Sequence, residues 1–148
     1  MKNKIKRIIF AILIIINCVI IFYFSHQVSD NSSMQSSRIV NLICNMIPTL
    51  RNYEEILTII VRKTAHFSIY AMLGLLTTNF ILTIENKRMY KIVLIPLVFC
   101  FIYAITDEIH QLFVAGRSGE IRDVCIDTLG VITGICILML IFKIIEER

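Results

Sequence analysis

The sequence lacks the signatures of a soluble enzyme or a disulfide-stabilised domain. Neither HExxH nor GxSxG occurs, so two common hydrolase motifs are missing. The five cysteines have no CxxC or other metal-ligand spacing; they are Cys18, Cys44, Cys100, Cys125 and Cys136. Three of them lie inside apolar runs, where cysteine behaves as a small apolar side chain. The sequence therefore predicts no disulfide framework, no metal and no cofactor.

Charge is also scarce. Charged residues form 18 % of the 148 residues, and the formal net charge is only +4 with no basic soluble segment. We therefore expect no nucleic-acid binding. In contrast, 57 % of the residues are hydrophobic and the mean hydropathy is +0.77. A soluble domain of this length could not bury so much apolar surface. The surplus must face lipid, which predicts an all-α, polytopic membrane protein.

Crossing a bilayer as a helix takes about 20 mainly apolar residues. Four segments approach this length, at about residues 8–24, 64–84, 92–106 and 124–145. They predict a single membrane domain over 1–148, built as a four-transmembrane-helix bundle. The third segment reaches full length only with its flanking residues, and Pro96 is expected to kink it because proline removes a backbone donor.

The polar segment 25–63 is more than a simple loop. It begins with Ser, Asp and Asn capping candidates, continues as an amphipathic run and is interrupted at Pro48 before a second helical stretch. This pattern predicts two short amphipathic helices at the outer membrane surface, the second continuing into the second span.

Basic residues predict the orientation of the spans, because cytoplasmic loops are enriched in Lys and Arg. The N-terminal tail, the link "ENKRMYK" (85–91) and the C-terminal tail carry nine of them, against six on the other side. Both termini are thus expected in the cytoplasm. The first apolar run resembles a signal peptide, but small residues of a cleavage site are missing around "FYFSHQ", so an uncleaved anchor is expected.

Polar residues form one stripe on each of three spans, because each helical residue advances by about 100°. The stripes contain Arg62, Lys63, His66 and Tyr70 on the second span; Tyr103, Asp107, His110 and Gln111 with Glu108 at the edge on the third; and Asp123, Asp127, Gly130 and Gly134 on the fourth. Ionisable groups at membrane depth avoid lipid. The three stripes therefore predict one shared polar cleft that opens outward.

Each residue of these stripes also has a plain structural interpretation. Arg62 and Lys63 can be interfacial anchors whose stems reach along the lipid boundary. Gly130 and Gly134, spaced as GxxxG, predict close helix packing, and Leu138 is expected to face lipid. Asn17, the one strongly polar side chain well inside a span, is expected to make an interhelical hydrogen bond. The cleft hypothesis rests on the alignment of all three polar stripes at one depth of the membrane.

The short turn "VAGRSGE" places Arg117 above the expected cleft. A guanidinium there can hold a phosphate or carboxylate through two hydrogen bonds, although an exposed loop cation fits the sequence equally well. The candidate ligand-binding residues are Arg62, Lys63, His66, Tyr70, Asp107, Glu108, Gln111, Arg117, Asp123 and Asp127.

Three blocks of this chain resemble the VanZ family, which is associated with low-level teicoplanin resistance. They are "FSHQVSDNSS", "RKTAHFSIYAMLG" and "DEIHQLFVAGRSGEIRDVCIDTLGVITG", in the order found in the family. One departure is Ala115, where the family usually has Pro before Gly-Arg. The resemblance implies a membrane protein of the bacterial cell envelope and a role in glycopeptide resistance. It implies no settled reaction.

Two hypotheses follow for the cleft. The favoured one is a binder of membrane lipid, in which Arg62, Lys63, His66 and Arg117 hold an anionic headgroup such as that of a lipid-linked wall precursor. The alternative is a membrane-embedded hydrolase or transferase acting on an envelope lipid or glycan precursor. Its acid and base candidates are His66, Asp107, Glu108, His110 and Asp123. A metal version of the enzyme would use His66, His110 and a carboxylate. The sequence identifies neither the ligand nor the oligomeric state.

Overall fold

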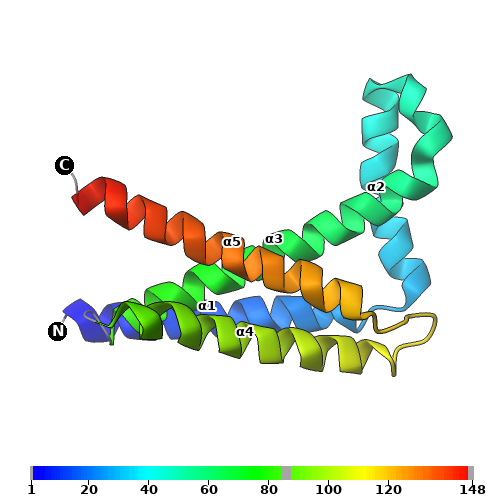
Figure 1. The fold of residues 1–148 in the computed structure, drawn as a ribbon. Coiled ribbons are helices and arrows are strands. Elements are labelled where there is room, and N and C mark those ends of the chain that lie inside the picture. The colour runs from blue at the N-terminus through cyan, green and yellow to red at the C-terminus, as the bar shows by residue number, and fades with distance from the viewer. Residues whose placement is uncertain (1, 85–87, 147–148) are drawn as a thin grey trace.

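The computed structural model describes residues 2–84 and 88–146. Its elements are α1 (Lys2–Ser25), α2 (Ser29–Met46), the 3-10 helix η1 (Pro48–Tyr53), α3 (Glu54–Leu82), α4 (Met89–Gln111) and α5 (Ile121–Glu146). Figure 1 shows α1, α3, α4 and α5 running along one bundle, while α2 runs crosswise at one end. The start of α1 and the end of α5 both lie at the opposite end of the bundle.

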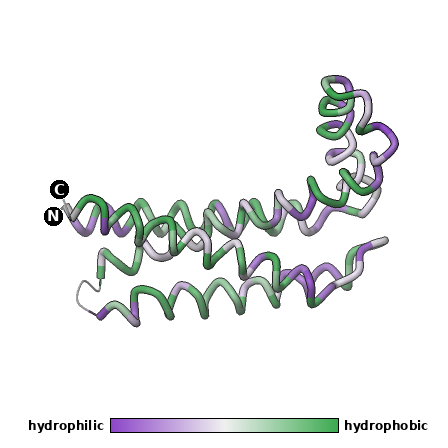
Figure 2. The backbone as a smooth tube through the Cα atoms, turned by 45° about the horizontal axis from the view of Figure 1, so that its top comes forward, coloured by the Kyte–Doolittle hydropathy of each residue, from purple (hydrophilic) through white to green (hydrophobic). Residues whose placement is uncertain are grey.

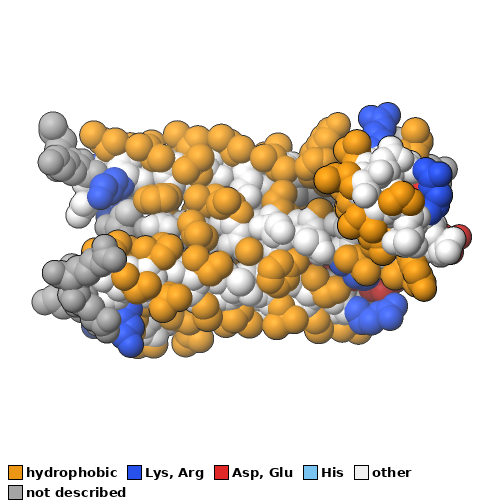
Figure 3. Space-filling model, turned by 90° about the horizontal axis from the view of Figure 1, so that it is seen from above, with side chains coloured by type: hydrophobic (Ala, Val, Ile, Leu, Met, Phe, Trp, Pro, Cys, Tyr) orange, Lys and Arg blue, Asp and Glu red, His pale blue; other side chains and the backbone are white. Residues whose placement is uncertain are grey.

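Four helices are long and apolar enough to cross a membrane, which confirms the all-helical, four-span prediction. These segments are Asn3–Ser25, Pro48–Leu82, Met89–Gln111 and Ile121–Ile145. Figure 2 shows hydrophobic residues along most of each long helix, with hydrophilic residues concentrated toward the helix ends. The face drawn in Figure 3 is a continuous apolar band with Lys and Arg near its two ends. The chain is therefore a multi-pass membrane protein.

The helices extend beyond the predicted apolar spans. The third span was expected at 92–106, but α4 continues to Gln111, so Asp107 and Glu108 lie in its last turns. The second was expected from residue 64, but α3 begins at Glu54. Hydropathy marks the lipid-facing length, whereas a helix continues through polar residues whose backbone hydrogen bonds remain intact. Residues 85–87 of the predicted basic link lie outside the described residues.

The first helix predicted between the first two spans is α2, and the second, predicted to continue into the second span, is formed by η1 and the start of α3. Pro48 begins η1, a position where its missing N–H costs little. In α2, Val40 and Cys44 are buried, whereas Leu42 is 66 % exposed and Met46 is 84 % exposed. One face of α2 therefore packs on the protein, mainly against α3, and another carries exposed apolar side chains.

Helices α3 and α5 approach each other closely through small residues. A Cβ added at Gly130 would overlap the carbonyl oxygen of Phe67, and one at Gly134 would overlap that of Ala71. This confirms the close packing predicted from the GxxxG spacing. Leu138 is only 6 % exposed, so the prediction that it faces lipid is wrong. It lies one turn after Gly134 and extends the same packed stripe.

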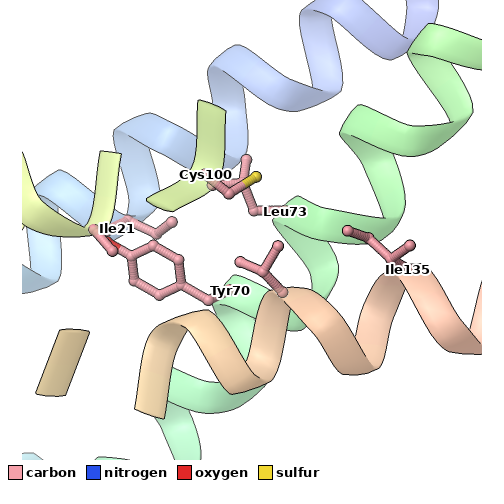
Figure 4. Close-up of a cluster of buried hydrophobic side chains, with 7 residues drawn as sticks. Ile21, Tyr70, Leu73, Cys100 and Ile135 are labelled. Atoms are coloured by element: carbon pink, nitrogen blue, oxygen red, sulfur yellow. The ribbon is translucent and has the colours of Figure 1, made fainter. Parts of the chain in front are cut away.

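The apolar core lies where α1, α3, α4 and α5 meet. Figure 4 shows Ile21, Tyr70, Leu73, Cys100 and Ile135 pointing into this cluster. Asn17 is also buried, at 7 % exposure. Its Oδ1 has no hydrogen-bond partner among the described residues, so the expected interhelical hydrogen bond is not found there.

The α3–α5 contact predicts a sharp steric response to a larger residue. Replacing Gly134 by Leu should force the helices apart and lower the free energy of unfolding by about 3 kcal/mol, the upper end of overpacking costs. The matched control is Cys136→Leu, two residues along α5, because Cys136 is exposed. Folded yield and thermal midpoint of the purified variants in detergent are the measurements. Equal values for the two variants would show that the glycine contact carries no packing constraint.

Candidate functional site

Three helices contribute one ionisable side chain each to a cluster at the end of the bundle next to α2. His66 comes from α3, Asp107 from α4 and Asp127 from α5, and one ligating atom from each lies within 4.8 Å of the others. Asp107 is 5 % exposed and Asp127 is fully buried. The structure thus brings together one member of each predicted polar stripe.

Several polar atoms of this cluster have no protein partner. Both carboxylate oxygens of Asp127, the Nδ1 atom of His66 and the hydroxyl of Tyr70 make no hydrogen bond with any described residue. His66 Nδ1 and Asp127 Oδ1 lie 3.6 Å apart, which is too long for a hydrogen bond. A buried carboxylate without partners is costly, so these atoms indicate a place where a ligand, ion or proton is held.

Asp107, in contrast, is well supported. Its Oδ2 accepts a hydrogen bond of 2.7 Å from Ser25 Oγ and a longer one of 3.4 Å from Gln111 Nε2. Gln111 Nε2 also donates to Glu108 Oε1 at 2.8 Å. The other oxygen of Glu108 accepts the backbone N–H of Glu120 at 2.9 Å. Glu108 and Gln111 therefore fix the loop that leads into α5 and orient Asp107.

Arg117 ties this loop to the end of α1. Its Nε donates to the carbonyl of Gln27 at 2.9 Å and its NH2 to that of Phe24 at 3.0 Å. Its NH1 donates to Gln111 Oε1 at 3.1 Å. Burial and the neighbouring Arg62 cation lower the pKa of Arg117 from its ordinary value. All three nitrogens are engaged within the protein, so Arg117 contributes its charge to the site while its donors hold the structure.

Two predicted ligand residues form a separate pair at the edge of the cluster. Lys63 makes an ion pair with Asp123, joining α3 to the first turn of α5. The polar stripes also led us to expect Asp107 and Asp123 within reach of His66 or Arg62; Asp107 lies beside His66, whereas Asp123 pairs with Lys63.

His110 does not join His66. Its Nε2 lies 3.2 Å from Nδ1 of His26, and its ring stacks on the ring of His26 and packs against Phe22. Each helical residue advances by about 100°, so His110, three residues after Asp107, points about 60° away from it around α4. His110 therefore faces α1. The metal hypothesis that combined His66 with His110 is thus wrong in its ligand set, and His110 has no place in the buried cluster.

A pocket of about 290 Å³ opens beside the cluster between α1, α2 and α3. Its lining surface is mostly apolar, although six polar residues contribute to it; the residues are Ile21, Phe24, Ile39, Val61, Ala65 and Ile69 together with Ser32, Gln35, Ser36, Arg62, His66 and Arg117. Ser25, which supports Asp107, and the four α2 residues of the pocket lining (Ser32, Gln35, Ser36 and Ile39) were not predicted as site residues. The block "FSHQVSDNSS" (24–33), which carried part of the family resemblance, contains Ser25 and Ser32 and was their sequence signal; Gln35 and Ser36 lie beyond it.

These features define an integral membrane protein with a buried acidic and histidine cluster at one end of its helical bundle. Residues 10–143 match the model of the VanZ/LLP1 family. The chain therefore belongs to the VanZ/LLP1 family. No curated protein and no solved structure matches it.

Proposed function

We propose that this protein binds an anionic lipid headgroup of the bacterial envelope, such as that of a lipid-linked cell-wall precursor, and thereby confers teicoplanin resistance. The observation that carries the proposal is the pocket, in which an apolar wall meets Arg62, His66 and Arg117. An anionic lipid has the same two parts, an apolar chain and a negatively charged headgroup. Basic pockets between transmembrane helices bind such headgroups.

Arg62 is the residue best suited to hold the headgroup. It lines the pocket and forms no ion pair with any acidic side chain among the described residues. The three nitrogens of Arg117 already donate hydrogen bonds to Phe24, Gln27 and Gln111. A guanidinium with free donors can grip a phosphate through two parallel hydrogen bonds. Arg62 therefore supplies the direct contact, and Arg117 adds positive charge behind it.

The resemblance to VanZ supports the consequence for resistance. A protein that occupies or shields a membrane-anchored wall precursor would reduce the access of a lipoglycopeptide to the same molecule. This requires the pocket to face outward. The nine basic residues at the ends near the two termini and in the link between α3 and α4, against six on the other side, support that orientation.

A second candidate function is a hydrolase or transferase acting on the same lipid class. His66 lines the pocket and lies 3.6 Å from the buried Asp127. A histidine near a carboxylate can serve as a general base once substrate binding brings the two within hydrogen-bond distance. If purified protein converts a labelled wall precursor and His66→Gln loses this activity, the reaction is established. If the precursor remains unchanged, the function is binding without catalysis.

Removing the free cation should weaken lipid binding. Arg62→Gln deletes a charged hydrogen-bond donor worth about 1.5–3 kcal/mol, so affinity for a fluorescent lipid-linked wall precursor should fall by roughly 10- to 100-fold in phosphatidylcholine nanodiscs. The teicoplanin concentration that inhibits growth should fall with it.

The matched control is Arg51→Gln, which removes an exposed cation of η1 outside the pocket. It should retain the affinity and the resistance of the parent chain. Comparable losses in the two variants would mean that general surface charge attracts the lipid, and the pocket would then have no specific role.

The proposed orientation predicts which cysteine probes are accessible in intact cells. Asn52→Cys on η1 should react with a membrane-impermeant maleimide, whereas Lys6→Cys near the start of α1 should react only after permeabilisation. Both positions are exposed, and labelling of the parent chain gives the baseline for its five native cysteines. The opposite pattern would place the pocket on the cytoplasmic side and contradict a direct role against an extracellular antibiotic.

A further inference from the structure

We propose that His66, Asp107 and Asp127 form a binding site for one divalent metal ion, Zn²⁺ or Mn²⁺. The three residues come from three different helices, yet one ligating atom of each lies within 4.8 Å of the others. The three residues lie far apart in the sequence and belong to no common motif, so the packing of α3, α4 and α5 brings them together. The site stands on its own geometry and does not depend on the lipid-binding proposal.

The separation of His66 and Asp127 fits a shared ion. His66 Nδ1 and Asp127 Oδ1 are 3.6 Å apart, beyond hydrogen-bond distance. Two ligands at about 2.0–2.2 Å from a tetrahedral Zn²⁺ lie roughly 3.4 Å from each other. A small adjustment of side-chain rotamers therefore places both atoms in the first coordination shell, with an Asp107 oxygen completing three protein ligands.

The unpartnered atoms provide a second, independent observation. Asp127 is fully buried and neither of its carboxylate oxygens has a hydrogen-bond partner among the described residues. The Nδ1 atom of His66 and the hydroxyl of the fully buried Tyr70 also have no hydrogen-bond partner among the described residues. Buried charges are normally paired or coordinate metals, and a divalent cation would satisfy the two carboxylates and the imidazole together.

The surroundings support these ligands as they do in known metal sites. Ser25 Oγ donates to Asp107 at 2.7 Å, and Gln111 Nε2 donates at 3.4 Å, so this carboxylate is oriented by outer hydrogen bonds. Gly130 allows α5 to touch α3 at Phe67, the residue that follows His66, and this contact sets Asp127 opposite the imidazole.

The donor set selects the kind of ion. Carboxylates bind most divalent cations, but an imidazole favours Zn²⁺ and other transition ions over Mg²⁺ and Ca²⁺. Three protein ligands leave at least one coordination position free. Because His66 also lines the pocket, that position is expected to face the pocket and to be available to water or to an anionic ligand.

The experiment measures metal content in protein from which the exposed histidine pair has been removed. Chain carrying His26→Gln and His110→Gln is purified in detergent, stripped with a chelator, and dialysed separately against Zn²⁺, Mn²⁺, Mg²⁺ or Ca²⁺. Mass spectrometry of the metals should find about one Zn²⁺ or Mn²⁺ per chain. Asp127→Asn and His66→Gln in this background should each lower affinity at least about 100-fold, exceeding the 10- to 100-fold typical of outer-shell changes.

Asp123→Asn is the matched control, because it removes a carboxylate of the same helix that pairs with Lys63; it should keep the ion. X-ray absorption is measured on the Zn²⁺-loaded protein that carries only His26→Gln and His110→Gln. This measurement therefore tests the proposal even if Asp127→Asn fails to fold. It should show nitrogen and oxygen ligands at about 2.0–2.2 Å. The proposal is overturned by three results: no stoichiometric ion, binding of Mg²⁺ or Ca²⁺ alone, or undiminished Zn²⁺ and Mn²⁺ affinity in folded Asp127→Asn and His66→Gln.

Discussion

The close approach of α3 and α5 is the constraint on which the rest of the molecule depends. Lipid tails are as apolar as leucine, so transmembrane helices gain little by hiding apolar side chains from lipid and associate through tight packing. Gly74, Gly130 and Gly134 permit backbone contact between the two helices. That contact brings Asp127 against His66 at one end and buries the core around Tyr70 and Leu73 in the middle.

The polar end of the bundle follows from the same packing. Once Asp107 and Asp127 are enclosed, each needs partners or an ion, since buried unpaired charge is strongly unfavourable. Ser25 and Gln111 serve Asp107, while Arg117 fastens the α4–α5 loop to the end of α1. The result is a hydrogen-bonded polar end with a partly apolar pocket beside it, an arrangement that suits the recognition of a lipid headgroup.

Periodicity predicted much of this arrangement. The four spans, the helices between the first two, the GxxxG contact and the stripes containing His66, Asp107 and Asp127 all follow from residue spacing. Spacing gives the direction of a side chain relative to its own helix, but the rotation of each helix against its neighbours comes from packing. For this reason the sequence did not separate His110 from Asp107, and it placed Leu138 on the lipid side. The α2 wall of the pocket was missed because it depends on how α2 folds back against α3.

A double-mutant cycle on His66 and Asp127 tests the central claim most directly. Unfolding free energies in detergent are measured for His66→Gln, Asp127→Asn and the pair, in protein loaded with Zn²⁺ and in stripped protein. Residues that share a network should couple by about 1 kcal/mol or more, whereas distant residues add within about 0.3–0.5 kcal/mol. His110 and Asp127 form the control pair and should be additive. Strict additivity of His66 with Asp127 in both conditions would contradict the convergence of the three helices on one site.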